Sequence, residues 1–181
     1  MIDPLLPRAI ALGFAVLFIA AAWHKLSDRG RFEAVLRDYQ LLPAIVCPPL
    51  TLLIPGVELT LGLGWISGLL PRITAMTTAA LLATYALAIG INLVRGRVYI
   101  DCGCGFGAAS DTEQPLSSVL VARNILLIGV VALTLVPVAE RTLGITDYVV
   151  ILAGLLTAIL LSAGSGQLIR NRAAMKIWRG K

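Results

Sequence analysis

Long apolar stretches dominate this sequence and most constrain its fold. Five of them, at residues 9–25, 45–70, 73–94, 116–137 and 146–169, are apolar enough to cross a membrane. Most approach or exceed the length of about 20 residues that a helix needs to span a hydrocarbon core of about 30 Å. Because no water is available there to pair with the backbone, each stretch must be helical. The sequence therefore predicts an all-α integral membrane protein, a bundle of about five transmembrane helices with a four-helix core plus one.

The composition excludes a soluble domain of this size. Of the 181 residues, 58% are hydrophobic and only 14% are charged, whereas soluble domains carry about 25% charged residues. A fold of this length cannot hide so much apolar surface from water, so the lipid bilayer must be its solvent. We expect one transmembrane domain over residues 1–181. Its first helix is expected to be retained, because Lys25, Arg29 and Arg31 follow the apolar stretch.

The basic residues predict the side of the membrane that each loop occupies. Five spans place the segment 26–44, the loop 95–115 and the tail 170–181 on one side, together with eleven lysines and arginines. The other side has three basic residues: Arg8, Arg72 and Arg141. The positive-inside rule therefore assigns the first side to the cytoplasm. We interpret the basic tail as an anchor on anionic lipid and expect no nucleic-acid partner.

A short amphipathic helix is predicted between the first two spans. Residues 27–43 carry apolar side chains at positions 32, 35, 36 and 39 among charged ones. This spacing is typical of a helix that lies in the membrane interface, with its basic side toward the lipid head groups.

The loop 95–115 holds two of the three cysteines, in the sequence Asp-Cys-Gly-Cys-Gly. Cys102 and Cys104 can form a disulfide, because the glycine between them tolerates unusual dihedral angles. So small a ring is strained, and strained, exposed disulfides exchange readily with other thiols. The pair predicts a thiol–disulfide exchange site, which would make the protein a thiol–disulfide oxidoreductase.

Cys47 and His24 are predicted at the same membrane face as this pair, since each borders a span on that side. Cys47 is a candidate relay thiol. Together, Cys47, Cys102, Cys104 and His24 also match a Cys₃His ligand set, so metal binding stays an alternative. A third interpretation treats the cysteines as inert small hydrophobic residues.

Two charged residues are predicted inside the spans. Glu58 lies about 16 Å beyond Cys47 along a helix, and Arg123 lies within the fourth stretch. A charge at that depth is costly unless it is paired. We expect a Glu58–Arg123 pair with His24 or Tyr85 near it. Both a structural clamp and a role in proton handling are open for this pair.

Several segments resemble known membrane proteins. The segments AAWHKLSDRGRFEAVLRDYQLLP and PGVELTLGLGWISGLL resemble the opening of the DoxX-like membrane proteins. The segment DCGCGFG, followed by PLSSVLVARNILL, is similar to the MauE family of methylamine-utilisation membrane proteins. The resemblance runs from about residue 10 to residue 137.

The resemblance implies a function in methylamine metabolism at the bacterial inner membrane. Such a protein would support disulfide formation in the small subunit of methylamine dehydrogenase, with a periplasmic thioredoxin-like partner of the MauD type. The resemblance implies that Cys102 and Cys104 are the exchanging pair. It also implies that Glu58 and Arg123 are supporting polar residues inside the membrane. A further likeness, to vitamin K epoxide reductase, implies Cys47 as a relay thiol and a quinone as cofactor by analogy.

These implications conflict with the charge count. A periplasmic partner needs the cysteines outside, whereas the basic residues place them in the cytoplasm. Two other functions are open. One is a non-enzymatic scaffold or chaperone for the immature subunit, and the other is a membrane protein that binds metal through cysteine and histidine.

Overall fold

The computed structural model describes residues 2–97, 116, 118–139, 141, 144–154 and 156–157. Within these residues the elements are α1 (Leu5–Ser27), α2 (Arg29–Asp38), the 3₁₀ turn η1 (Ala44–Val46), α3 (Cys47–Ser67), α4 (Pro71–Val94) and α5 (Ser118–Leu133). A short helix, Ile145–Gly154, follows. The described part contains no strand beyond one isolated bridge. The predicted all-α fold is confirmed.

Three of these helices are long and apolar enough to cross a membrane: α1, α3 together with η1, and α4. The helices α5 and Ile145–Gly154 are apolar but shorter. Large apolar side chains such as Leu53, Leu63 and Ile66 point outward and are more than half exposed. Such a surface suits lipid and not water, so the protein is a membrane protein.

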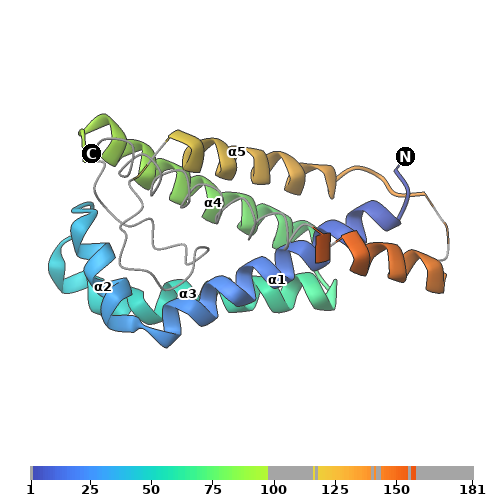
Figure 1. Ribbon diagram of the computed structural model, residues 1–181, viewed down its shortest axis with the longest axis horizontal. Coiled ribbons are helices and arrows are strands. Elements are labelled where there is room, and N and C mark those ends of the chain that lie inside the picture. Colours follow the sequence, from blue (N-terminus) through green and yellow to red (C-terminus); the bar gives the residue numbers. More distant parts are fainter. Residues whose placement is uncertain are drawn as a thin grey trace, which may run out of the picture.

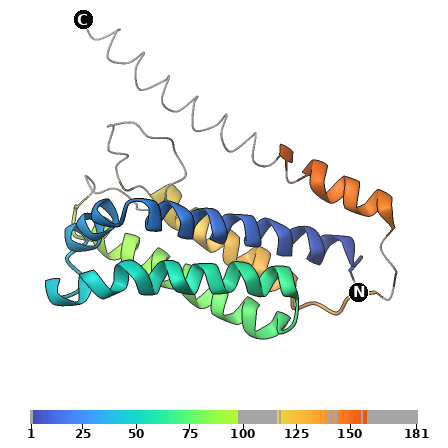
Figure 2. The same ribbon diagram turned by 90° about the horizontal axis from the view of Figure 1, so that it is seen from below.

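The helices associate as two antiparallel pairs, α1 with α3 and α4 with α5 (Figures 1 and 2). The backbones of α1 and α3 approach closely at Gly62. A Cβ atom there would lie 2.7 Å from Cγ1 of Ile19 and 3.3 Å from the carbonyl oxygen of Ala15. Small residues permit this close packing between membrane helices, where dispersion contacts supply much of the attraction.

A tight turn connects α3 to α4 and so joins the two pairs. Gly68 follows α3 with φ of 60°, a left-handed conformation that glycine adopts without strain. Its N–H donates to the carbonyl of Gly64 at 3.1 Å. Pro71 then begins α4, where a proline needs no backbone hydrogen bond.

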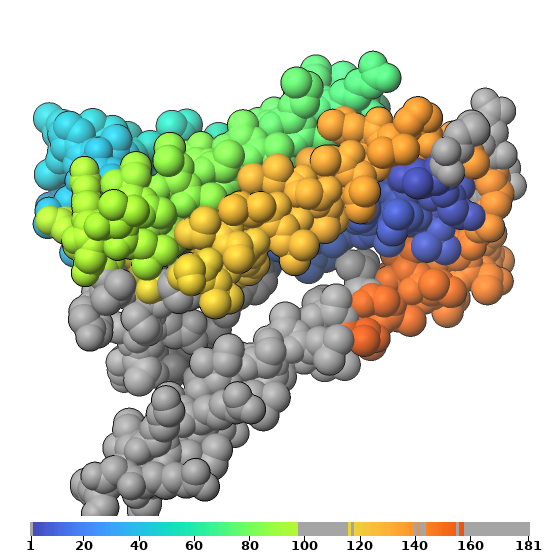
Figure 3. All heavy atoms as spheres, turned by 90° about the horizontal axis from the view of Figure 1, so that it is seen from above, coloured from blue at the N-terminus to red at the C-terminus, as the bar shows by residue number. Residues whose placement is uncertain are grey.

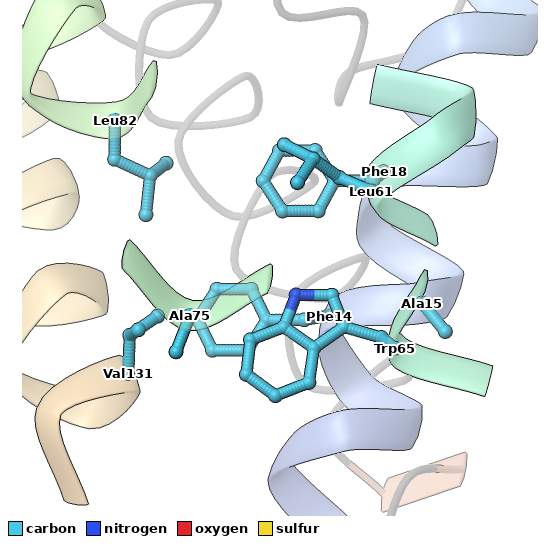
Figure 4. Packing of buried hydrophobic residues seen from close by; sticks show 8 residues of the cluster. All are labelled: Phe14, Ala15, Phe18, Leu61, Trp65, Ala75, Leu82 and Val131. Carbon is cyan, nitrogen blue, oxygen red and sulfur yellow. The ribbon is translucent and has the colours of Figure 1, made fainter. Parts of the chain in front are cut away.

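The apolar core contains residues from α1, α3, α4 and α5 (Figure 4). Its fully enclosed members are Phe14, Ala15, Phe18, Leu61, Trp65, Ala75, Leu82 and Val131. The rings of Phe14 and Trp65 stack with centroids 5.5 Å apart. The indole N–H of Trp65 donates to the hydroxyl of Thr78 on α4 at 3.0 Å. This contact satisfies a buried polar group and connects the α1–α3 pair to α4.

The predicted interfacial helix is present as α2. Asp28 caps its N-terminus, because the carboxylate accepts from the backbone N–H of Arg31 at 2.9 Å. Phe32 and Val35 are buried, while the charged side of the helix is exposed. The helix ends at Asp38, several residues before the end of the predicted segment.

The two ends of the bundle differ. At one end α1 and α4 finish while α3 and α5 begin, and α2 lies beside them (Figure 1). We call this the cysteine end, because Cys47 begins α3 there. At the opposite end Ile2 bridges to Val138, and Arg141 pairs with Asp3 at 3.3 Å.

Candidate functional site

Cys47 occupies the first position of α3 and is completely buried. It is a free thiol whose sulfur lies 3.8 Å from the carbonyl oxygen of Pro43. Pro43 precedes η1, which turns the chain from α2 into α3. The burial leaves this thiol out of reach of a soluble partner in the observed conformation.

Cys102 and Cys104 lie outside the described residues, but the chain on either side of them is placed. Arg95, directly after α4, donates to the carbonyl of Gln40 at 3.5 Å. Leu116 is buried against Ile89, and Tyr39 packs against the same cluster. Both flanks of the Cys-Gly-Cys loop are therefore held at the cysteine end, beside the connection that leads to Cys47.

A buried charged cluster lies further inside the bundle. The ammonium group of Lys25 on α1 donates to both carboxylate oxygens of Glu58 on α3, at 2.6 and 2.9 Å. The hydroxyl of Tyr85 on α4 donates to Oε1 of Glu58 at 2.8 Å. Lys25 and Glu58 are 5% and 1% exposed, so neither charge is solvated by water. The three side chains connect α1, α3 and α4.

Aromatic rings complete the surroundings of the Lys25 ammonium group. Its Nζ lies 5.6 Å from the ring centroid of Phe32 on α2 and 5.8 Å from that of Tyr85. Both distances fall within the range of cation–π attraction. Through Phe32 the interfacial helix α2 is connected to the charged cluster.

The predicted Glu58–Arg123 pair is wrong. Glu58 is neutralised by Lys25, and Arg123 forms no ion pair with any residue that the structure describes. Of the two expected neighbours, Tyr85 contacts Glu58, whereas His24 is exposed on the outer side of α1. The reason is helical register, because Lys25 and not His24 lies on the buried face of α1.

Sequence reasoning missed Lys25 as a site residue, although a signal for it was present. Phe14, Phe18 and Lys25 recur at intervals of four and seven residues, which places them on one helix face. All three are buried. The position of Lys25 at the end of an apolar stretch favoured its interpretation as an interfacial charge.

A second group of polar side chains lies between α4 and α5 near the cysteine end. Asn92 is fully buried, and its amide nitrogen donates to the carbonyl of Ala88 at 3.1 Å. Asn124 is also buried and donates to the carbonyl of Leu120 at 2.8 Å. Among the residues that the structure describes, two buried side-chain atoms lack a hydrogen-bond partner: Oδ1 of Asn92 and Nε of Arg123.

The alternative metal site gains no support from the residues that are placed. Across the described ranges no group of three histidine, cysteine, aspartate or glutamate side chains is close enough to hold a metal ion. His24 is exposed while Cys47 is enclosed. The other two residues of the Cys₃His set, Cys102 and Cys104, lie outside the described part of the chain.

An apolar groove of about 1000 Å³ runs between α3 and α4 on the outside of the bundle. Residues such as Leu53, Gly56 and Thr77 line it, and none of the lining residues is charged. The groove has no titratable group that could take part in thiol or proton chemistry.

Comparisons with known proteins agree on one family. The model of a family described as methylamine utilisation protein MauE matches residues 4–137, a stretch that includes α1 to α5 and the cysteine loop. The methylamine utilization protein MauE of Paracoccus denitrificans is 37% identical over 127 residues, which cover 70% of this chain and 67% of the relative. The protein of the same name from Paracoccus versutus is 34% identical over 140 residues, covering 76% of this chain and 74% of the relative.

A third relative of this name, from Methylorubrum extorquens, is 30% identical over 122 residues, covering 67% of this chain and 64% of the relative. No solved structure matches this chain.

Proposed function

Because this chain belongs to the MauE family of methylamine utilisation proteins, we propose that it exchanges disulfides through Cys102 and Cys104. The exchange would support disulfide formation in the small subunit of methylamine dehydrogenase. The protein would lie in the bacterial inner membrane, and its partner would be a thioredoxin-like protein of the MauD type. The wider likeness to DoxX-like proteins stays a prediction.

The observation that carries this proposal is the position of the described residues on either side of the segment that bears the two cysteines. Arg95 and Leu116, on either side of it, are anchored at the cysteine end by Gln40 and Ile89. Residues at the end of a membrane bundle can be approached by a partner from the aqueous phase. Cys47 is enclosed at the same end, so it could relay only to a thiol of this chain.

The exchange is a sequence of two substitutions at sulfur. A thiolate of the partner attacks the Cys102–Cys104 disulfide, and one cysteine of the loop leaves as a thiolate. The second thiol of the partner then attacks the mixed disulfide, so the partner becomes oxidised and the loop cysteines become a dithiol. Two electrons and two protons pass from the partner to this chain. The reverse sequence would reduce the partner.

Trapping of the mixed disulfide tests the proposal directly. In cells that also make the thioredoxin-like partner, we expect Cys102→Ser or Cys104→Ser to accumulate a covalent complex with it. In the reverse direction the remaining loop thiolate attacks the disulfide of the oxidised partner, and the second loop thiol, which would resolve the mixed disulfide, is missing. Acid quenching, maleimide blocking and non-reducing electrophoresis would detect this complex. The matched control is Cys47→Ser, which removes an enclosed thiol and leaves the exchanging pair intact.

The outcomes separate the alternatives. No complex in either variant, with normal oxidation of the dehydrogenase subunit in the double variant Cys102→Ser, Cys104→Ser, would contradict exchange and favour a scaffold. Stoichiometric zinc or copper in the purified protein, lost in the double variant, would instead favour metal binding.

A further inference from the structure

We propose that the groove between α3 and α4 binds one anionic diacyl phospholipid, with the phosphate at Arg72 and the acyl chains between the two helices. Arg72 lies at the end of the bundle opposite the cysteine end, so the inference is independent of the proposed exchange. It is carried by the shape of the groove, by the apolar surface of its walls and by the charge of the arginine beside it.

The groove has two walls only at the end where Arg72 lies. On α3 the lining residues run from Pro49 to Ser67, about 27 Å along the helix. On α4 the lining is limited to the first two turns, from Ile73 to Thr77. The part with two walls therefore belongs to one leaflet of the membrane. The whole groove measures about 1000 Å³, which is large enough for a ligand of considerable size.

The walls offer a ligand only apolar contacts, although hydroxyl groups line them. The hydroxyls of Thr60, Ser67 and Thr77 each donate to a backbone carbonyl of their own helix, at 2.8, 3.1 and 2.9 Å. None of the lining residues is charged. Acyl chains need no hydrogen bond, and dispersion contacts can hold them as they hold membrane helices together. The chemistry of the walls therefore fits the chains of a lipid.

No helix in the described part of the chain covers this groove. The lining residues Leu53, Leu70 and Ile73 are each more than half exposed. The short helix Ile145–Gly154 lies on the side of α1, away from α3 and α4 (Figure 2). The end of α3 and the start of α4 form an outer edge of the bundle (Figure 3). The groove therefore opens toward the surrounding lipid.

Arg72 supplies the charge that selects an anionic head group. It is exposed, directly precedes the lining residue Ile73, and forms no ion pair with any residue that the structure describes. No aspartate or glutamate occurs between residues 59 and 100. Because no side chain caps α4, the backbone N–H groups of Arg72 and Ile73 can donate to the same phosphate.

The net charge of the head group then decides between lipids. Phosphatidylcholine carries its own cation beside the phosphate, whereas phosphatidylglycerol has a net negative charge. Arg72 therefore attracts phosphatidylglycerol more strongly.

Native mass spectrometry of the purified full chain tests this selectivity. The chain in detergent is titrated separately with dioleoyl phosphatidylglycerol and dioleoyl phosphatidylcholine, which have identical acyl chains. We expect the first phosphatidylglycerol to bind about fivefold more tightly, and Arg72→Met to remove this preference. The matched control is Arg8→Met, which removes an exposed arginine at the same end of the bundle. Arg8 lies on α1, which does not line the groove, so the preference should remain.

A second pair of variants tests whether the acyl chains occupy the groove. Thr77→Phe fills the part with two walls and should reduce binding of the first phosphatidylglycerol, although Arg72 is intact. The matched control is Met76→Phe in the same turn of α4. Met76 is 67% exposed and does not line the groove, so binding should be unchanged. Circular dichroism checks that both variants are folded.

Three results would overturn the inference. Equal affinity of the natural sequence for the two lipids would exclude an anionic site. A preference that Arg72→Met retains, or that Arg8→Met also loses, would mean that Arg72 does not select the lipid. Conversion of a dimer to a monomer by Thr77→Phe, with unchanged lipid binding, would mean that the groove holds a second copy of this chain. All of these measurements leave Cys102 and Cys104 unchanged, so their failure is distinct from failure of the proposed exchange.

Discussion

At the scale of single residues, the Lys25–Glu58 pair buries two charges in the interior of the bundle. Each charge loses its hydration on entering the membrane, a cost that attraction to the partner and further hydrogen bonds must offset. Glu58 accepts from both Lys25 and Tyr85. Removal of one partner leaves the other charge buried and uncompensated, so a single substitution should destabilise the protein more than the double substitution.

We expect Lys25→Met to reduce the free energy of unfolding by about 3–5 kcal/mol, the typical cost of breaking a buried ion pair. Adding Glu58→Leu to this variant should recover most of the loss, because no isolated charge remains. Unfolding in sodium dodecyl sulfate, followed by circular dichroism, measures both. The control is Arg37→Met, which breaks the exposed pair with Glu33 and should cost less than about 1 kcal/mol.

A double variant that is no more stable than Lys25→Met alone would contradict this account. It would mean that the ion pair contributes a specific contact that apolar packing cannot replace. The same pair of measurements therefore tests whether the cluster acts as a structural clamp.

The charged residues also show what local sequence can predict. That Glu58 lies inside the membrane follows from its place within a long apolar stretch. Its partner could not be predicted in this way, because Lys25 and Arg123 both lie in apolar helices and the choice depends on which helix packs beside α3. Lys25 is the partner of Glu58 because α1 packs against α3 in the tertiary structure.

At the scale of helices, the close approach of α1 and α3 depends on Gly62. A methyl group at this position would meet Ile19 and the backbone of Ala15 at less than ordinary contact distance. Gly62→Ala should therefore destabilise the protein by about 1–3 kcal/mol through overpacking.

The matched control for this substitution is Gly56→Ala in the same helix. Gly56 is exposed, and no other atom lies within 4 Å of an added Cβ. This change should be neutral or stabilise the helix by about 0.5–1 kcal/mol. Thermal unfolding in nanodiscs compares the two. Equal effects of both substitutions would contradict the role of Gly62 in packing.

Helix positions were largely predictable from the sequence. Apolar runs of about 20 residues and the apolar spacing at Phe32 and Val35 are local signals, and α1, α2, α3 and α4 follow them. Helix ends were less predictable, because they depend on single residues. Gly68 ends α3 before the predicted boundary at residue 70, and Pro71 begins α4 before the predicted boundary at residue 73.

At the scale of the whole molecule, the arrangement of two antiparallel pairs could not be predicted. Hydropathy locates each span but carries no information on which spans pack together. The Trp65–Thr78 and Glu58–Tyr85 hydrogen bonds join the pairs across α3 and α4. Such contacts depend on side chains far apart in sequence. One part of the candidate site could be predicted from the order of the spans alone. This part is the location of Cys47 at the same end of the bundle as both flanks of the cysteine loop.

The length of α4 predicts that this helix crosses the membrane. From Pro71 to Val94 the helix has 24 residues, a length of about 36 Å, which exceeds a hydrocarbon core of about 30 Å. Arg72 and Arg95, both exposed, lie near its two ends. In a chain without its own cysteines, Arg72→Cys and Arg95→Cys should react with a membrane-impermeant maleimide from opposite sides of the membrane. Labelling of both from the same side would contradict a spanning α4.

The side that labels Arg95→Cys also decides the orientation of the cysteine end, because Arg95 lies on the same side as the loop that follows it. Labelling in intact cells would mean that the loop faces the periplasm, where a thioredoxin-like partner could reach Cys102 and Cys104. The charge-based orientation would then be wrong. Labelling only after lysis would place the loop in the cytoplasm, as the excess of lysine and arginine predicts. Exchange with a periplasmic protein would then be excluded, because thiols on opposite sides of a membrane cannot form a mixed disulfide.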